Sequence, residues 1–300
     1  MKFRNLVAST LLISGLAGAA ACAQESKADV SPEPPEFAVA DVEANPDSWR
    51  EVEPENLLVF ETTKGRIVIE MLPVAAPNHV KQFSAIAKSG LYAGTPFHRV
   101  IDDFMDQGGD IRMVNGVGSG LPDLKGEFTF RVQPGEMEIN PVGPMDTATR
   151  GLYKGFPIAT QAAFLSEMTG DASVDRWIPH CPGIVSTART DDPNSANSQF
   201  FLMRYQADHL DKQYTAWGRV IDGFDVVRAI KKGPPPNGSP IAQPDILQKA
   251  YVVSDLPADE QMTAWVQRTD TPEWTERLAA ADQADADICD VMRVPAVIAE

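Results

Sequence analysis

The sequence predicts a mainly β domain, in which a closed antiparallel barrel is capped by two α-helices. Short apolar runs bounded by Gly, Pro, Asn and Asp recur along the middle of the chain, as they do in β-strands. Two segments of that region instead carry apolar residues at helical spacing. The length of 300 residues allows one large domain or two small ones. Many short strands with two helices indicate a barrel that is closed on itself.

The first predicted elements are two strands and a helix. Residues 57–62 and 66–71 form the strands, which a tight turn joins. The helix begins near Pro77, where Asn78 is placed to cap the first free amides, and Gly90 ends it. Its apolar positions are Val80, Phe83, Ile86 and Ala87. Their spacing predicts one buried face.

The later elements follow the same pattern. Further strands are predicted over residues 97–101, 183–188, 199–203, 215–220 and 246–253. A second helix carries Val226, Val227 and Ile230. It starts after a turn at residues 222–225 and ends at the proline-rich residues 233–236. The last strand completes the barrel.

Residues 1–23 have the features of an export signal. Two basic residues precede residues 6–17, which are mostly apolar and too short to span a bilayer. We expect cleavage after Ala23 and a periplasmic or exported protein. Cys22 keeps a second interpretation open, in which cleavage before it leaves a lipid anchor at the envelope. Ala19 stands where such sites usually have leucine.

Charge and composition narrow the class of partner. The formal charge of -16 becomes -18 without residues 1–23, because that segment holds two basic residues and no acidic one. So acidic a surface argues against a nucleic-acid partner, since nothing offsets phosphate repulsion. Residues 24–54 are rich in Pro, Glu, Ala and Ser, which predicts a flexible linker.

The two remaining cysteines leave two interpretations open. In an oxidising compartment Cys181 and Cys289 could pair, and otherwise they are two buried thiols. Pairing depends on how close their Cα atoms come, which the sequence does not fix.

The residues that indicate a functional site lie mainly in one segment. The run FHRVIDDFMDQGGD, which begins at residue 97, places Arg99 between apolar neighbours of a predicted strand. Phe104, Met105 and Gln107 follow, so a cation, an apolar wall and an amide lie within nine residues. The run resembles the active-site signature of the cyclophilins, which isomerise peptidyl-proline bonds. Residues 197–202, NSQFFL, resemble the second signature of that family.

The resemblance covers about residues 55–256 and implies a fold and an activity. The fold would be a barrel of eight strands with two capping helices. The activity would be peptidyl-prolyl cis-trans isomerisation without a cofactor, on proline-containing unfolded or partly folded polypeptides. An X-Pro amide rotates slowly because its partial double bond must break, at about 18–20 kcal/mol. Arg99 can donate to the prolyl nitrogen, whose lone pair becomes available when the amide twists.

The resemblance also implies roles for individual residues. The catalytic set would be Arg99, Phe104 and Gln107. The substrate-binding set would be Phe97, His98, Met105, Ala188, Arg189, Gln199, Phe201, His209, Leu210 and Tyr214. The apolar members are also compatible with core positions. No metal site is expected, because no Cys/His cluster has zinc spacing.

Three rim positions depart from the family pattern. Arg189 stands where many cyclophilins have asparagine. His209 stands where cyclophilins that bind cyclosporin tightly often have tryptophan, and Tyr214 where histidine is usual. The expected catalytic set is intact, so these changes bear on drug affinity and sequence preference and not on the reaction.

Two regions have no counterpart in a minimal cyclophilin. Residues from about 133 to 180 are predicted to be an inserted loop region with a short helix at 159–168, either a surface loop or a lid or partner-binding element. Residues 257–300 hold ten acidic and three basic side chains. They predict two amphipathic helices that pack on the barrel, with partner docking as the alternative. The first would carry Met262, Trp265 and Val266, and the second Trp274, Leu278 and Ala281.

The sequence therefore predicts an exported peptidyl-prolyl isomerase. The rival interpretations are a non-catalytic module that binds proline peptides and an envelope scaffold that acts through its tail. Arg99, Phe104 and Gln107 together favour the enzyme.

Overall fold

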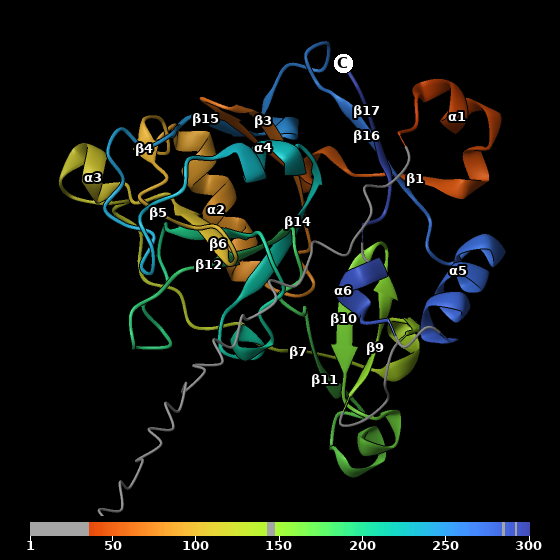
Figure 1. Ribbon diagram of the computed structural model, residues 1–300. Coiled ribbons are helices and arrows are strands. Elements are labelled where there is room, and N and C mark those ends of the chain that lie inside the picture. Colours follow the sequence, from red (N-terminus) through yellow and green to blue (C-terminus); the bar gives the residue numbers. More distant parts are fainter. Residues whose placement is uncertain (1–35, 143–147, 284–285, 292) are drawn as a thin grey trace, which may run out of the picture. The chain divides into compact units, whose positions relative to one another are not determined.

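The computed structural model describes residues 36–142, 148–283, 286–291 and 293–300 (Figure 1). The predicted export signal, with Cys22, and the first part of the predicted linker lie outside the described residues. Within the described ranges, the helices are too short or too polar to cross a membrane.

The largest sheet has nine strands in the order β4-β15-β2-β3-β14-β12-β13-β6-β5, and neighbouring strands are antiparallel. Its strands are β2 (Leu57–Thr62), β3 (Gly65–Met71), β4 (Thr95–Pro96), β5 (Arg99–Ile101), β6 (Met105–Gly108), β12 (Ile184–Thr187), β13 (Phe200–Met203), β14 (Ala216–Asp222) and β15 (Ile246–Val252). The predicted mainly β class is confirmed.

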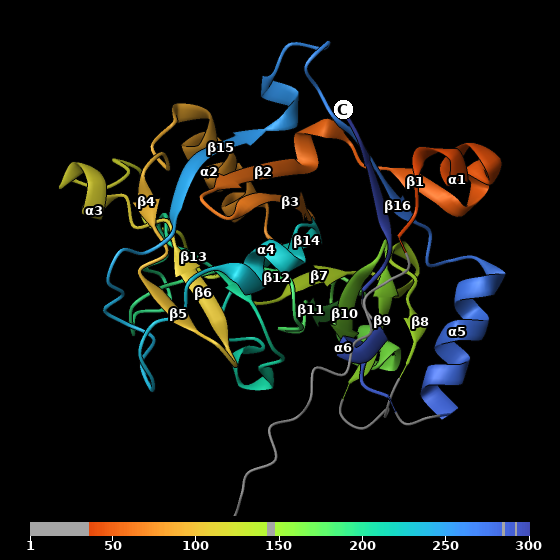
Figure 2. The same ribbon diagram turned by 45° about the horizontal axis from the view of Figure 1, so that its top comes forward.

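The predicted closed barrel of eight strands is wrong. Among the described residues, the edge strands β4 and β5 do not pair with each other, and the sheet is a curled half-barrel (Figure 2). β4 has two residues and β5 has three, too few to form a long ladder between the two edges. Local sequence shows that a strand exists, whereas closure depends on how distant strands pair.

Two helices pack against this sheet. Helix α2 (Pro77–Ser89) ends at Gly90, which has φ 74° and so adopts the left-handed conformation that favours glycine. The four predicted apolar residues of α2 are buried in one core cluster with residues of β2 and β3. Val227 of α4 (Phe224–Ala229) lies in the same cluster. Both predicted helices therefore exist, but their expected position as caps of a closed barrel is not confirmed.

The N-terminal cap of α2 differs from the prediction. The Asn78 side chain does not cap the helix. Instead, the Glu127 carboxylate accepts hydrogen bonds from the backbone amides of Asn78 and His79, each at 3.1 Å. A carboxylate suits this position because the first amides of a helix have no partner within it.

Alternation along the strands of the main sheet directs apolar residues into two large core clusters. In β13, Phe200 and Leu202 lie in the cluster that contains α2, whereas Phe201 and Met203 lie in the other. In β5, Val100 joins the first cluster. Its neighbour Arg99 therefore projects from the side of the sheet that carries Phe201.

The predicted flexible linker is wrong from residue 36 onward. Helix α1 (Val39–Ala44) is followed by β1 (Trp49–Glu51), which pairs with a strand of the tail. Trp49 is 7% exposed and shares a small core with Val42 and Val297. Val297 lies more than 200 positions from Val42 and Trp49, so local composition could not reveal the fold of this segment.

The predicted inserted loop region is a second sheet. Its five strands are β7 (Phe130–Val132), β8 (Asn140–Pro141), β9 (Thr149–Tyr153), β10 (Phe156–Thr160) and β11 (Val174–Trp177). A two-residue turn joins β9 to β10, with φ 50° at Lys154 and 80° at Gly155, as a type I′ hairpin requires. The predicted helix at residues 159–168 is wrong, because Ala159 and Thr160 belong to β10 and only Ala163–Met168 form a 3-10 helix.

The tail is only partly helical. The predicted first helix is strand β16 (Thr263–Gln267), which lies between β1 and β17 (Ala296–Ala299) in a three-stranded sheet. The second helix is confirmed as α5 (Pro272–Gln283), with Trp274 and Leu278 buried. Short helices α3 (Arg112–Asn115) and α6 (Ile288–Val291) complete the described helices. Residues 263–266 of β16 alternate between half-buried and buried, and the partners of this strand are β1 and β17.

A disulfide joins Cys181 and Cys289, whose Cα atoms are 5.0 Å apart. Cys181 lies in the turn before β12, and Cys289 lies in α6. The bond resolves the question that the sequence left open. It connects the main sheet to the tail across 108 positions of sequence.

Candidate active site

Three of the predicted site residues form a row across adjacent strands. Arg99 of β5 is directly opposite Gln107 of β6, and Gln107 is directly opposite Phe201 of β13. Residues that are paired across antiparallel strands project from the same face, so the three side chains lie on one side of the sheet. Arg99 and Gln107 are half-buried and Phe201 is 5% exposed. The row places a cation, an amide and an aromatic ring next to one another.

Hydrogen bonds fix the polar part of this row. The Arg99 guanidinium donates to the side-chain oxygen of Gln107 at 3.3 Å and to the backbone oxygen of Asn237 at 3.1 Å. The Gln107 amide nitrogen donates to the side-chain oxygen of Gln199 at 2.9 Å. Gln107 thus accepts from one neighbour and donates to the other, and this sets the orientation of its amide.

The apolar part of the site belongs to one core cluster. Met105, Phe201 and Leu210 are buried in it, and the half-buried Phe104 packs against it. The Phe201 ring meets Tyr214 edge-on, with centroids 5.8 Å apart. The apolar residues assigned to a proline pocket therefore share one large cluster, which also contains residues of the second sheet and of the tail.

The rim residues contact one another. The exposed His209 ring stacks on Phe104, with centroids 5.7 Å apart. The Arg189 guanidinium lies 4.4 Å from the centroid of Tyr214 and donates to the Gln213 backbone oxygen at 3.0 Å. Arg189 is thereby anchored on the rim. Its neighbour Ala188 is half-buried and donates its backbone N–H to the Gln199 oxygen at 2.9 Å.

Of the two residues that precede Arg99, Phe97 lies in the core and His98 lies beside Gln199. Phe97 is 1% exposed and packs edge-on against Phe200, in the core cluster that contains α2. Its predicted place in the pocket is therefore wrong, because the chain turns between β4 and β5 and directs this ring inward. His98 is half-buried beside Gln199 and Asp110. Burial lowers the pKa of the His98 imidazole, which favours its neutral form.

Three polar residues that lie close to Phe201 were not predicted from the sequence. His180 shares a hydrogen bond of 2.9 Å with Asp211 through Nδ1 and another of 2.9 Å with the Ser186 hydroxyl through Nε2. The His180 ring stacks on Phe201, with centroids 6.1 Å apart. Ser186 is directly opposite Phe201 across β12 and β13. The three residues stand at positions 180, 186 and 211, and no regular spacing marks them as a group.

This chain of hydrogen bonds has the connectivity of a nucleophilic Ser–His–Asp triad. A nucleophile must reach its substrate, however, and Ser186 is 0% exposed. A substrate has no path to its hydroxyl in this structure. The group therefore supports Phe201 from below and is not a second catalytic centre.

A buried ion pair lies on the opposite side of β6. Asp106 is 0% exposed, and its carboxylate accepts from the Arg204 guanidinium at 3.0 Å. Burial raises the pKa of Asp106 to about 7, although the charge of Arg204 acts in the other direction. Arg204 also donates to the backbone oxygens of Asp102 and Arg228, at 3.1 and 2.8 Å. The pair ties β6, and so Gln107, to the elements behind the sheet.

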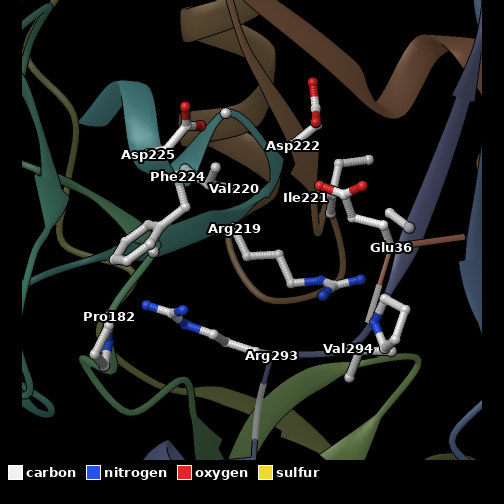
Figure 3. Close-up of a pocket in the computed structure, with 14 residues that line it drawn as sticks. Glu36, Pro182, Arg219, Val220, Ile221, Asp222, Phe224, Asp225, Arg293 and Val294 are labelled. Atoms are coloured by element: carbon white, nitrogen blue, oxygen red, sulfur yellow. The ribbon is translucent and has the colours of Figure 1, made fainter. Parts of the chain in front are cut away.

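A cavity of 420 Å³ lies elsewhere, between the end of β14 and residues 293–296 (Figure 3). The side chains of Arg219 and Arg293 cross it, and Phe224 forms one wall. Arg219 is already paired, since it donates to Glu70 at 2.9 Å. The residues that line this cavity include none of the predicted site residues.

Comparisons with known proteins agree with the site. The family model described as cyclophilin type peptidyl-prolyl cis-trans isomerase/CLD matches residues 57–252. A probable peptidyl-prolyl cis-trans isomerase of Brucella suis is 32% identical over 206 residues, which are 68% of this chain and 85% of that protein. A peptidyl-prolyl cis-trans isomerase of Streptomyces antibioticus is 33% identical over 180 residues, 57% of this chain and 81% of that protein.

A solved structure extends the likeness beyond the family region. The crystal structure of cyclophilin AquaCyp293 from Hirschia baltica is 42% identical, with a TM-score of 0.82. The match covers 88% of this chain and 98% of that one, and so includes more than the residues that the family model matches. Sequence motifs, fold and relatives agree: this chain belongs to the cyclophilin-type peptidyl-prolyl cis-trans isomerases, a family of enzymes.

Proposed function

We propose that this cyclophilin assists the folding of exported proteins by twisting X-Pro amides in the site around Arg99. The observation that carries the proposal is the row of Arg99, Gln107 and Phe201 across three strands. It sets a hydrogen-bond donor beside an aromatic surface of the kind that a proline ring packs against.

Arg99 is proposed to act on the twisted state. In a planar amide the nitrogen lone pair is delocalised into the carbonyl, so it accepts hydrogen bonds poorly. Rotation frees the lone pair, and a guanidinium N–H can then donate to it. Gln107 and Asn237 hold the guanidinium in place before substrate arrives, so little reorganisation is needed at the transition state. The interaction lowers the barrier because it is stronger in the twisted state than in either planar state.

The neighbouring residues are proposed to hold the substrate. Phe104, Met105, Phe201 and Leu210 would contact the proline ring. Gln107 and Gln199 would hydrogen-bond the peptide backbone, with Ala188 beside the extended chain that precedes the proline. The half-buried His98 lies next to Gln199 and is a further candidate for backbone contact.

The rim is proposed to set sequence preference. His209 offers a smaller apolar surface than tryptophan at the pocket mouth, and it stacks on Phe104. Arg189 and Tyr214 form a cation–π pair that places a positive charge on the rim. Acidic side chains near the proline are therefore expected to be tolerated at this side of the site.

The proposed location is the periplasm or another exported compartment, with a lipid anchor through Cys22 as the alternative. The apolar segment at residues 6–17 and the small residues before Gln24 support export. The disulfide between Cys181 and Cys289 fits an oxidising compartment. Fractionation of cells that express the chain and its Cys22→Ser variant separates the two locations. An anchored protein moves from the membrane to the soluble fraction in the variant, whereas a secreted protein is soluble in both.

A protease-coupled isomerase assay on the chain from residue 24 tests the proposed activity. The expected result is acceleration of cis-to-trans conversion of short X-Pro peptides in proportion to enzyme concentration. An exported protein whose refolding is limited by proline isomerisation should also refold faster. A non-catalytic proline-peptide module would bind the peptides and leave the conversion rate at its uncatalysed value, which would reject the proposal.

A further inference from the structure

The disulfide lies next to the residue that supports the pocket floor. Cys181 directly follows His180 and is 0% exposed, and its partner Cys289 is 3% exposed. The backbone at Cys181 is held on both sides, since its N–H donates to the Pro179 oxygen at 2.9 Å and its oxygen accepts from Ile184 at 3.1 Å. These bonds connect Cys181 to the segment that carries His180 and to the start of β12.

His180 in turn sets the position of Phe201. Its ring stacks on Phe201 with an interplanar angle of 21°, and both of its nitrogens are hydrogen-bonded. The His180 N–H also donates to Asp211 at 2.9 Å, so backbone and side chain share one acceptor. His180 has few alternative positions while these contacts last. Phe201 rests on it and faces Gln107 and Arg99 along the row.

The tail contacts the same core as the pocket. Ile288 and Val291 of α6 are buried in the cluster that holds Phe201 and Leu210. Figures 1 and 2 show α6 beside β9 and β10, away from the edge strand β5 that carries Arg99. α6 has four residues, too few to be stable without tertiary contacts. The disulfide at Cys289 adds a covalent restraint to the buried side chains that hold α6 in place.

We propose that the Cys181–Cys289 disulfide is a redox-sensitive positioning element for the isomerase site. With the bond intact, Cys181 holds His180 under Phe201 and the floor is fixed for the proline ring. Once the bond is reduced, α6 is released, His180 gains freedom, and isomerisation slows. This inference rests on the proposed role of Phe201 in binding the proline.

The reduction is a two-electron step driven by a dithiol. One thiolate of the dithiol attacks a sulfur of the disulfide, and the sulfur–sulfur bond breaks to give a mixed disulfide and one cysteine thiol. The second thiol of the reagent displaces the other cysteine. The protein gains two electrons and two protons as two thiols, and the dithiol becomes a cyclic disulfide. Because both cysteines are buried, local opening of α6 precedes the attack.

The experiment compares the oxidised and dithiol-reduced chain from residue 24 in the protease-free isomerase assay, in which cis peptide is followed directly. Thiol trapping and mass spectrometry verify each redox state, and near-ultraviolet circular dichroism at the assay temperature verifies the fold. We expect kcat/KM to fall at least fivefold on reduction and to return on reoxidation. The double variant Cys181→Ala, Cys289→Ala should show the low value with or without dithiol.

A His180→Asn variant distinguishes this coupling from plain stabilisation. If the disulfide acts through His180, the oxidised variant is already slow and reduction causes little further loss, so the two changes are non-additive. If the reduced wild type stays folded with unchanged kcat/KM, or if its activity falls only because it unfolds, the disulfide is a structural link and the inference is overturned. An oxidised wild type without any isomerase activity would instead reject the proposed function itself.

Discussion

Arg99 and Gln107 face each other across β5 and β6, and the guanidinium of Arg99 donates to the side-chain oxygen of Gln107 at 3.3 Å. Gln107 is itself oriented by Gln199, because its amide nitrogen donates to the side-chain oxygen of Gln199 at 2.9 Å. The Arg99 guanidinium is therefore oriented by oxygens of neutral amide groups, and not by a carboxylate. None of its hydrogen-bond partners in the described residues is a carboxylate that would compete with a substrate for the guanidinium.

Replacing Arg99 tests its proposed role in catalysis. Arg99→Ala should lower kcat/KM at least tenfold, equivalent to about 1.4 kcal/mol of barrier, because the donor to the twisted amide is lost. The loss should fall on kcat more than on peptide affinity. Arg99→Lys should recover little, since an ammonium lacks the planar fork that Gln107 and Asn237 hold.

The matched control is Arg268→Ala, which removes an exposed arginine of the tail. It should leave turnover at the wild-type level. The melting temperature of Arg99→Ala should stay close to that of wild type, because the side chain is half-buried at the surface of the sheet. More than half of wild-type kcat/KM in the alanine variant would contradict the assigned role.

The rim prediction concerns cyclosporin. His209→Trp should tighten inhibition, because an indole adds apolar contact and an N–H donor where the exposed histidine now stacks on Phe104. A gain of about 0.5–1.5 kcal/mol corresponds to roughly a 2- to 12-fold lower inhibition constant. Turnover of short peptides should change little. Gln206→Trp, on the same loop, is the control, and equal inhibition constants for wild type and His209→Trp would refute the prediction.

Helix α5 of the tail is predicted to stabilise the fold rather than to act in catalysis. Trp274 of α5 is 2% exposed, and its indole donates to the Gln267 side chain at 2.9 Å. Trp274→Ala should cost about 3–5 kcal/mol, which is a fall in melting temperature on the order of 10 °C. Turnover of short peptides, measured well below the transition, should remain similar. Glu276→Ala, an exposed change on the same helix, should alter neither quantity.

Truncation extends the same test. A chain that ends near Leu256 lacks β16, the strand partner of β1, and lacks Cys289. It should melt at a lower temperature than the full chain. If the tail served only to dock a partner, the melting curve of the truncated chain would match that of the full chain.

The buried Asp106 predicts a specific pH dependence of stability. Burial raises the pKa of Asp106 in the folded state to about 7, above the unfolded value near 4. The folded state then binds this proton more tightly than the unfolded state does. The resulting contribution to the free energy of unfolding is fully present below about pH 4 and declines as the pH rises to about 7. This contribution is on the order of a few kcal/mol.

Melting curves of wild type and Asp106→Asn between pH 4 and pH 8 measure this contribution. The stability of wild type relative to the variant should decrease as the pH rises, because asparagine does not titrate. Asp103→Asn, an exposed neighbour, is the control. Parallel curves for wild type and Asp106→Asn would show that Arg204 keeps Asp106 ionised throughout this range.

Local sequence predicted the elements whose partners lie nearby. The strand at residues 57–62 agrees with β2, and the helix from Pro77 to Gly90 agrees with α2, because alternation and helical spacing are local properties. The sequence also predicted that Arg99, Met105 and Gln107 belong to one site, since all three come from one short hairpin. Phe97 was misplaced because it precedes the strand, where alternation no longer fixes the side of the sheet.

The sequence by itself determined the mainly β class, the family resemblance and the central residues of the candidate site. Only the tertiary structure decided that residues 130–177 form a sheet, that β1 pairs with β16, and that Cys181 meets Cys289. It also decided that His180, Ser186 and Asp211 support Phe201. The physical reason is distance along the chain: periodicity and turn residues report contacts within about ten positions, whereas these pairings form when the collapse of the whole chain brings remote apolar and polar groups together.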